Sequence, residues 1–522
     1  MLYESFTPFD TMDERSDPSI AIIGGGFGGL ATACFLADAG ADVLLLEKNE
    51  QLGGRASTLT ADGFRFDMGP SWYLMPDVFE RFFGAFDRRP EDYYEIEHLD
   101  PHYRIFFKDG DRIDVMADRE RTRETFEAYE PGAGAALDRY LATSRENYEV
   151  GMEHFVYTDR PRFRDWIDRD VLRNARGLSL LGSMQDHVEG YFEHPKLQQL
   201  VQYSLVFLGG SPATTPAIYN LMSHVDFTLG VHYPDGGMGA VVDGMATLAD
   251  ELGVAVYTNH EVTSIEGKRG GFLVRAAGPA DDVVGFPVDL VVSNADYRHT
   301  EMALLPPEKR QYDRSYWESR TYAPSAFLLY LGVEGDVENL AHHTLVLPLD
   351  WETHFTQLFD EPTWPDDPAY YLCVPSKTDD SVAPDGHSNL FVLVPVAAGL
   401  EDTPERRRAY RNLVLADVAA HTGVDLRDRI VFERTFTVSD FADRYNSANG
   451  TALGLAHTLR QTALFRPRRR STAVDGLYFT GAYTTPGIGV PMCLISGELT
   501  ADAVLAEEPW FATDRSTGSD GR

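Results

Sequence analysis

Residues 20–31 of the chain read IAIIGGGFGGLA, and the order of apolar residues and glycines in this stretch predicts how the chain begins to fold. The apolar run that ends at Ile23 has the pattern of a buried parallel strand. Gly24 allows a tight turn, Gly26 lets the backbone approach a pyrophosphate, and Gly29 lets the next helix pack on the sheet. The helix would point its N-terminal amides at phosphate. The stretch therefore predicts a dinucleotide-binding unit.

The residues after this helix strengthen the prediction. Residues 41–46 (ADVLLL) read as a second buried strand, and Glu47 stands at its end, 18 residues after Gly29. An acidic side chain at this place binds the ribose hydroxyls of a dinucleotide. The same charge repels a 2′-phosphate, so NADP is disfavoured.

The composition limits the class of protein. The 522 residues include 81 acidic and 46 basic residues, for a net charge of −35, and only six of the basic residues are lysines. Such an acidic chain is not expected to bind nucleic acid. Acidic excess with arginine in place of lysine is typical of proteins that work in concentrated salt, which indicates a halophilic source. The length favours two or more domains.

The number of cysteines and the lengths of the apolar runs indicate where in the cell the protein is expected to work. Cys34, Cys373 and Cys493 are too few and too scattered for a disulfide framework or a metal site, so a reducing cytoplasm and no metal are expected. Residues 1–18 lack the pattern of a signal peptide, and residues 1–18 and 507–522 read as polar tails. No run of about 18 apolar residues predicts a spanning helix. Peripheral contact with a membrane stays open.

A second glycine pair narrows the dinucleotide to FAD. Gly53 and Gly54 would allow another close backbone approach, and the Arg55 guanidinium suits the pyrophosphate. With the first motif, this pattern resembles the flavoproteins with two dinucleotide-binding domains, the amine oxidase and phytoene desaturase superfamily. In that superfamily the chain returns to the flavin domain near Val262, whose backbone would contact adenine.

Residues 476–497 predict a strand, a glycine loop and a helix that complete the flavin site. Pro491 suits the first turn of the helix, whose amides, including that of Met492, would point toward the flavin pyrimidine edge. Such a dipole favours the anionic reduced flavin. We also assign Gly481, Ala482 and Val490 of this segment to the cofactor site.

Four stretches are similar to the phytoene desaturase family of bacteria and archaea, and the resemblance runs from about residue 19 to 505. They are residues 66–71 (FDMGPS, with Ser71 assigned to the cofactor), 233–239 (YPDGGMG), 375–379 (PSKTD) and 481–491 (GAYTTPGIGVP). The resemblance implies an α/β, Rossmann-like flavoprotein with a discontinuous FAD domain, a mixed-sheet substrate domain and a helical membrane-facing subdomain. The expected FAD segments are 19–75, 230–298 and 472–506, the substrate segments 76–135 and 299–471, and the helical segment 136–229.

The resemblance also implies the chemistry. Family members use FAD to remove hydrogen from a long polyene, and oxygen or a quinone then reoxidises the flavin. We therefore expect a carotenoid desaturase at a membrane surface, acting on phytoene or, as a 3,4-desaturase, on a later acyclic carotenoid. Some relatives carry an Asp and an Arg three residues apart near the flavin. Here Ala142 replaces the Asp, and Arg145 is the one candidate catalytic residue.

Other functions stay open. An amine oxidase would share the N-terminal motifs, although no lysine stands where such enzymes place one beside the flavin. A flavin-dependent carotenoid isomerase would keep every motif, and a non-catalytic polyene-binding protein would keep the fold.

Three further groups of residues allow two interpretations each. Residues 326–331 and 390–394 could form a cavity floor or ordinary core strands. The apolar pieces at 178–181 and 205–208 suit core packing or a bilayer surface. The basic run 466–470 (RPRRR) reads as a surface turn, or as a contact with anionic lipid.

Overall fold

The computed structural model describes residues 17–158, 182–208, 210–280, 282–458, 460–508 and 510. Most of both predicted tails, the apolar piece at 178–181 and part of the expected helical segment lie outside these residues.

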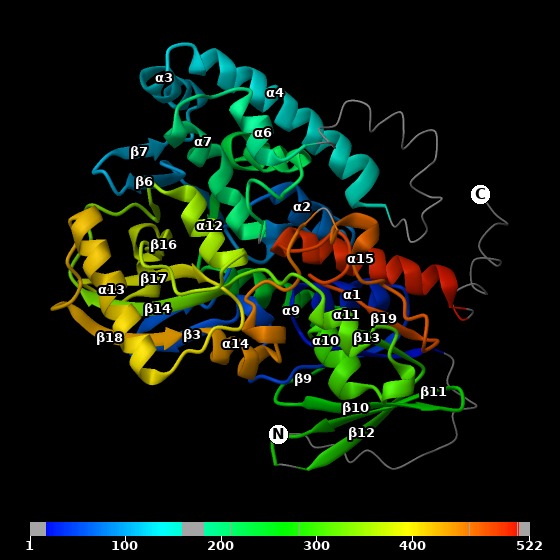
Figure 1. Cartoon of the computed structure of the whole chain (residues 1–522). Helices are drawn as coiled ribbons and strands as arrows, with labels where there is room; N and C mark the ends of the chain where they lie inside the picture. Colours follow the sequence, from blue (N-terminus) through cyan, green and yellow to red (C-terminus); the bar gives the residue numbers. More distant parts are fainter. Residues whose placement is uncertain are drawn as a thin grey trace.

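A five-stranded parallel sheet is built from widely separated parts of the chain (Figure 1). β1 (Ser19–Ile23) is central, with β2 (Asp42–Leu46) and β9 (Ala255–Tyr257) on one side. β13 (Leu290–Ser293) and β19 (Leu477–Phe479) lie on the other side. The predicted α/β class with a Rossmann-like sheet is therefore confirmed.

Helices cover this sheet and bring its C-terminal segment to the first glycine motif. α1 (Phe27–Asp38) follows β1, and α15 (Val490–Glu507) packs along α1 (Figure 1). A Cβ atom at Gly497 would lie 2.5 Å from the Cβ of Ala31, so glycine permits the close helix packing. α9 (Met238–Glu251) also packs on α1.

A three-stranded antiparallel sheet follows α9 and β9. Its strands are β10 (Glu261–Lys268), β11 (Gly271–Ala277) and β12 (Val283–Val288). The pairing of β10 with β11 shifts register between Val262 and Ser264. Val262 lines the cavity described below.

A seven-stranded mixed sheet forms the second large layer. Its strands in spatial order are β18 (Ile430–Phe436), β14 (Ser325–Glu334), β17 (His387–Val396), β16 (Tyr370–Cys373), β15 (His343–Leu347), β6 (Tyr103–Phe107) and β7 (Arg112–Val115). Phe327 and Leu329 of β14 face one core cluster, while Ala326 and Leu328 lie on the other face. Burial on both faces explains the uninterrupted apolar pattern of β14.

Helices stand above the second face of this sheet (Figure 1). They include α3 (Arg119–Tyr129), α4 (Ala133–Gly151), α6 (Met184–Glu189), α7 (Pro195–Gln202) and α8 (Leu221–His224). Among the described residues, none of the helices has the length and apolar character needed to cross a membrane.

The remaining elements connect these layers. They are α2 (Pro76–Gly84), α10 (Tyr297–His299), α11 (Arg314–Glu318), α12 (Trp351–Phe359), and the short strands β3 (Thr58–Ala61), β4 (Phe64–Asp67), β5 (Ile96–His98) and β8 (His232–Pro234).

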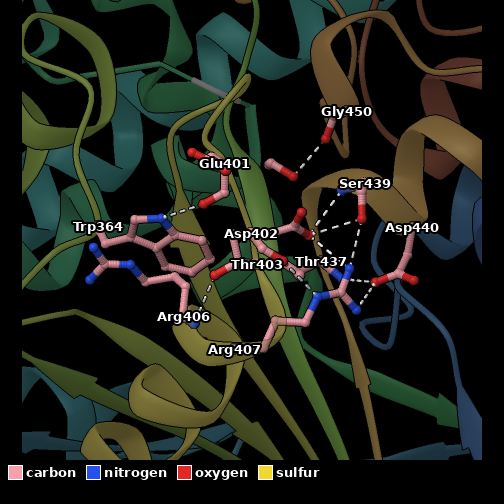
Figure 2. Close-up of polar contacts among 11 residues, drawn as sticks. Trp364, Glu401, Asp402, Thr403, Arg406, Arg407, Thr437, Ser439, Asp440 and Gly450 are labelled. Carbon is pink, nitrogen blue, oxygen red and sulfur yellow. Dashed lines mark hydrogen bonds and ion pairs between the residues drawn. The ribbon is translucent and has the colours of Figure 1, made fainter.

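A polar network joins α13 (Pro404–Thr422) to α14 (Val438–Tyr445), as Figure 2 shows. Arg407 lies 2.8 Å from carboxylate oxygens of both Asp402 and Asp440 and donates to Ser439 at 2.7 Å. Asp440 also accepts from the backbone of Thr437 at the start of α14. The network fixes a helix whose side chains reach the cavity described next.

Candidate functional site

A cavity of about 1640 Å³ lies between the parallel sheet, the seven-stranded sheet and the helices above it. Sites for a single drug-sized molecule usually measure about 300–1000 Å³. The larger volume provides space for a dinucleotide and a second, long ligand.

The two N-terminal glycine motifs meet at one end of the cavity. The amide of Gly53 donates to the carbonyl of Gly25 at 2.8 Å, and Gly26 and Gly53 form a parallel bridge. Gly24 and Gly54 have positive φ angles of 94° and 57°, conformations that favour glycine. The two turns therefore present bare backbone to the same space.

Glu47 closes this end at the tip of β2. Its carboxylate is buried and accepts the amide of Gly25 at 2.8 Å and two donors of Asn49 at 2.8 Å each. These bonds fix the carboxylate at the cavity wall, where ribose hydroxyls can reach it.

Arg55 supplies free cationic donors to the cavity. Its Nε and Nη2 atoms are buried and have no hydrogen-bond partner among the described residues. A buried guanidinium with unused donors is costly unless an anion meets it. The site therefore fits the pyrophosphate of a dinucleotide on an observation independent of the motif.

The C-terminal glycine loop lines the other side of this end. α15 begins after Gly489, whose φ is 123°, and Val490 and Met492 line the cavity. Arg466 braces the loop by donating to the carbonyls of Ala482 (2.5 Å) and Tyr483 (3.3 Å).

The basic run 466–470 was misinterpreted from the sequence. Arg466 and Arg469 are only 4% and 6% exposed, and Arg469 donates to the carbonyls of Ser496 and Thr485. Both are internal braces of the C-terminal segment, so the surface-turn interpretation is wrong for them.

The rest of the cavity is apolar. Its floor contains Ala326 and Leu328 of β14 and Leu393 of β17, so the cavity-floor interpretation holds for one face of these strands, while their other face packs in a core cluster. Further lining side chains come from the helices and the segment after α4: Met152, Phe155, Val156, Ile218, Leu221, Met222 and Val225. This wall suits a hydrocarbon ligand.

Ten of the thirteen site residues proposed from the sequence line this cavity. They are Gly24, Gly26, Glu47, Gly54, Arg55, Ser71, Val262, Ala482, Val490 and Met492. Gly29 and Gly481 lie behind the wall: a Cβ at Gly29 would meet the Gly24 carbonyl oxygen at 2.1 Å, and one at Gly28 would meet Gly481 Cα at 3.0 Å. Both glycines allow the backbone segments behind the wall to pack closely, and neither lines the cavity itself.

Arg145 is not among the lining residues. Its side chain is 65% exposed and pairs with Glu149 one turn along α4, at 2.7 Å. The position offers no route to a ligand in the cavity, so the geometry gives no support to a catalytic role.

We expect Arg145→Ala to leave the catalytic rate within about twofold of wild type and to lower stability by less than about 0.5 kcal/mol, because exposed pairs of this kind contribute little. Steady-state assays and thermal unfolding in the same salt would test this. A large loss of rate with unchanged stability would restore the catalytic assignment.

Two residues near the glycine motifs escaped the sequence analysis. Asn294, which follows β13, lines the cavity and donates to the carbonyl of Gly24 at 3.1 Å. Tyr371 of β16 also lines the cavity, and its hydroxyl lies 2.8 Å from the Ser71 hydroxyl. Neither belongs to a local motif, because each reaches the site through strand pairing.

A buried carboxyl lies behind the apolar wall. Asp226, next to the lining residue Val225, accepts from the hydroxyls of Tyr103 (2.7 Å) and Tyr203 (3.0 Å). Burial raises the pKa of Asp226 to about 7. The folded protein therefore holds a proton here between about pH 4 and 7, where the unfolded chain has lost it.

This difference predicts a pH-dependent effect of Asp226→Asn. Since the folded state binds the extra proton, the contribution of Asp226 to the free energy of unfolding falls as pH rises through that window. Asparagine does not titrate, so the stability of the variant relative to wild type should increase from about pH 4 to 7, by on the order of 4 kcal/mol at most. Thermal unfolding of both proteins across this range tests it; a difference in Tm that does not change with pH would contradict it.

Comparison with known proteins agrees with this geometry. Residues 27–505 match the model of the flavin-containing amine oxidoreductases. A carotenoid 3,4-desaturase from Haloarcula japonica is 67% identical over 499 residues, which cover 95% of this chain and 100% of that protein. A zeta-carotene-forming phytoene desaturase from Myxococcus xanthus is 33% identical, with 93% of each chain covered.

A solved structure shares the fold at low identity. An oxidoreductase from Methanosarcina mazei superposes with a TM-score of 0.61 at 15% identity, covering 93% of this chain and 100% of that one. The matched family and the desaturase relatives span nearly the whole chain. The chain therefore belongs to the flavin-containing amine oxidoreductase family and, within it, to the FAD-dependent carotenoid desaturases.

Proposed function

We propose that this protein is a carotenoid 3,4-desaturase that removes two hydrogens from an acyclic carotenoid. The observation that carries the proposal is one cavity that the glycine turns, Glu47 and Arg55 line at one end and that apolar side chains line elsewhere. The 67% identity to a carotenoid 3,4-desaturase favours this step over the desaturation of phytoene.

In this proposal the chain's own residues hold FAD at the polar end. Glu47 binds the ribose, Arg55 and the glycine turns hold the pyrophosphate, and Val262 contacts adenine. The amides at the start of α15 and the loop at Ala482 face the flavin ring. The FAD segments expected from the sequence, residues 19–75, 230–298 and 472–506, contain all of these proposed contacts and stay part of the proposal.

When bound, FAD supplies the hydride acceptor for the reaction. The contribution of the protein is then to hold the polyene in register across the acceptor and to exclude water. The floor side chains Ala326, Leu328 and Leu393 can do both, because they present a continuous apolar surface. Removal of hydride from an allylic carbon leaves a delocalised cation, so a strong base is not required for the following proton loss.

The position of the lysine in the cavity lining argues against the amine oxidase alternative. Lys48 is the one lysine among the described lining residues, and its ammonium group donates to the carbonyl of Asp443 and pairs with Glu261. It stands at the nucleotide end, next to Glu47, so it cannot serve as the lysine beside the flavin ring.

We further propose that the carotenoid is taken from a membrane surface, that the protein is a peripheral cytoplasmic protein, and that oxygen or a quinone reoxidises the flavin. Comparing turnover with vesicle-bound and detergent-dispersed carotenoid, each under oxygen and under a quinone, tests these points. Equal turnover of vesicle-bound and detergent-dispersed carotenoid would refute the proposal that the substrate is taken from a membrane surface.

The function itself is tested by incubating the FAD-loaded protein in concentrated salt with phytoene and with later acyclic carotenoids. We expect a red shift of the absorption spectrum and a product lighter by two hydrogens. An isomerase would change the spectrum without changing the mass, and peroxide release with amines would support an amine oxidase. An unchanged mass with every carotenoid would refute the desaturase proposal.

A further inference from the structure

Three buried side chains with metal-binding atoms gather beneath the cavity wall: His342, His343 and Cys373. The ring nitrogens and the sulfur that they offer lie within 4.8 Å of one another. His343 and Cys373 are directly opposite each other on the antiparallel strands β15 and β16. All three are buried, with exposed fractions of 6%, 0% and 1%.

The two imidazoles are prepared as ligands. The Nδ1 atoms of His342 and His343 lie 2.7 Å from the hydroxyls of Thr378 and Tyr371, respectively. Each Nε2 atom is buried and has no partner among the described residues. One ring nitrogen held by an oxygen partner while the other is unused is the usual arrangement of metal-binding histidines.

We propose that His342, His343 and Cys373 bind one closed-shell metal ion, either the borderline Zn²⁺ or the soft Cu⁺. Two imidazoles and a thiolate match these ions, whereas Ca²⁺ and Mg²⁺ prefer oxygen ligands. Bonds of about 2.0–2.3 Å bring ligand atoms to roughly 3.5 Å from one another, and modest side-chain rotation supplies the remaining approach.

The surrounding charges favour a cation at this place. The carboxylate of Asp67 faces Cys373, and that of Asp379 faces His342. Asp67 is itself buried and has no ion pair among the described residues; it accepts only the amides of Met238 and Gly239.

Binding would exchange a proton for the metal ion. A free cysteine holds its proton as S–H at neutral pH. The ion displaces this proton, which leaves to solvent, and the bound thiolate cancels one positive charge. The remaining charge of a Zn²⁺ site is balanced by the neighbouring Asp67 carboxylate.

The ion would also set the direction of hydrogen bonds in the cavity wall. With the metal on Nε2, His343 must carry its hydrogen on Nδ1 and donate to the Tyr371 oxygen. Tyr371 then donates to Ser71, whose own hydroxyl can donate to the Cys373 sulfur. The site would thus orient two polar groups that line the cavity.

The test is metal analysis of the FAD-loaded protein by inductively coupled plasma mass spectrometry. It is applied to protein as isolated, after dialysis with Zn²⁺, and after anaerobic dialysis with Cu⁺, so that the two ions are distinguished. We expect about one ion per chain in wild type and at least a tenfold loss of affinity in Cys373→Ser.

Cys34→Ser is the matched control, since Cys34 is also a fully buried thiol but lies in α1. It should keep the metal, and visible flavin absorbance verifies that both variants are folded. Co²⁺ gives a second readout: a thiolate charge-transfer band that is present in wild type and Cys34→Ser and absent in Cys373→Ser. Less than about 0.1 ion per chain in wild type after both dialyses, or equal binding by Cys373→Ser, would overturn the proposal.

Discussion

Gly29→Ala is expected to yield protein with less than a tenth of the wild-type FAD content and a lower Tm. A Cβ at this position would lie 2.1 Å from the carbonyl oxygen of Gly24 and 3.1 Å from the side-chain nitrogen Nδ2 of Asn294. Neither neighbour can move freely, because the Gly24 amide donates to Leu46 at 2.8 Å and Asn294 donates to the Gly24 carbonyl. The start of α1 must therefore move off the sheet.

The size of the effect follows from the rigid neighbours. Overpacking usually costs about 1–3 kcal/mol, and backbone-to-backbone conflict belongs at the upper end. A loss of about 3 kcal/mol in binding corresponds to roughly a hundredfold weaker FAD binding. Flavin absorbance of the purified protein measures the loss of FAD, and the Tm in the same salt measures the loss of stability.

Gly84→Ala is the control for this substitution. Gly84 ends α2, and a Cβ there would meet no atom within 4 Å. The change should leave FAD content unaltered and raise stability slightly, since alanine restricts the unfolded chain. If Gly29→Ala also retained its FAD and its Tm, then the close packing at Gly29 would not be needed for cofactor binding.

The elements that sequence analysis predicted well are those whose partners are close along the chain. Gly24, Gly26 and Glu47 lie within one βαβ unit, so their spacing alone fixes where they meet. The adjacent glycines of residues 53–54 were predictable for the same reason. The α/β class and the cofactor end of the cavity therefore followed from local patterns.

The features that sequence analysis missed depend on contacts between residues that are far apart in the sequence. The basic run 466–470 looked like a surface turn, because nothing nearby in sequence shows that Arg466 and Arg469 turn inward onto the C-terminal loop. A guanidinium can be buried when backbone carbonyls accept its donors, and those carbonyls lie some 16 residues or more further along.

The cluster of His342, His343 and Cys373 could not be predicted from the sequence for the same reason. His343 and Cys373 are 30 residues apart, a spacing that matches no local metal motif. They meet because β15 and β16 pair in a register that places them opposite each other. Strand register is set by the whole sheet and by its two buried faces, so the residues alone did not reveal the group.

Arg55→Ala is expected to weaken FAD binding by about 100- to 10,000-fold while the fold is kept. Each hydrogen bond to a charged group contributes about 1.5–3 kcal/mol, and Arg55 has two buried donors that only a ligand can use. Arg55→Lys keeps the charge but loses the planar fork, so binding should stay at least about tenfold weaker than in wild type. Flavin fluorescence titration of apoprotein gives these constants, and Arg145→Ala is the matched arginine control.

The dependence of FAD binding on salt distinguishes a buried contact with Arg55 from long-range attraction by surface charge. At the ionic strengths an acidic protein of this kind is suited to, charges on the surface are screened within a few ångströms, whereas a pair in a closed cavity is screened much less. The defect of Arg55→Ala should therefore persist as salt is raised. A defect that disappears at high salt would mean that Arg55 acts only by long-range attraction, and the donors at Nε and Nη2 would need another partner. Because a ligand stabilises the folded state more when it binds more tightly, the rise in Tm on adding FAD should also be smaller in Arg55→Ala than in Arg145→Ala.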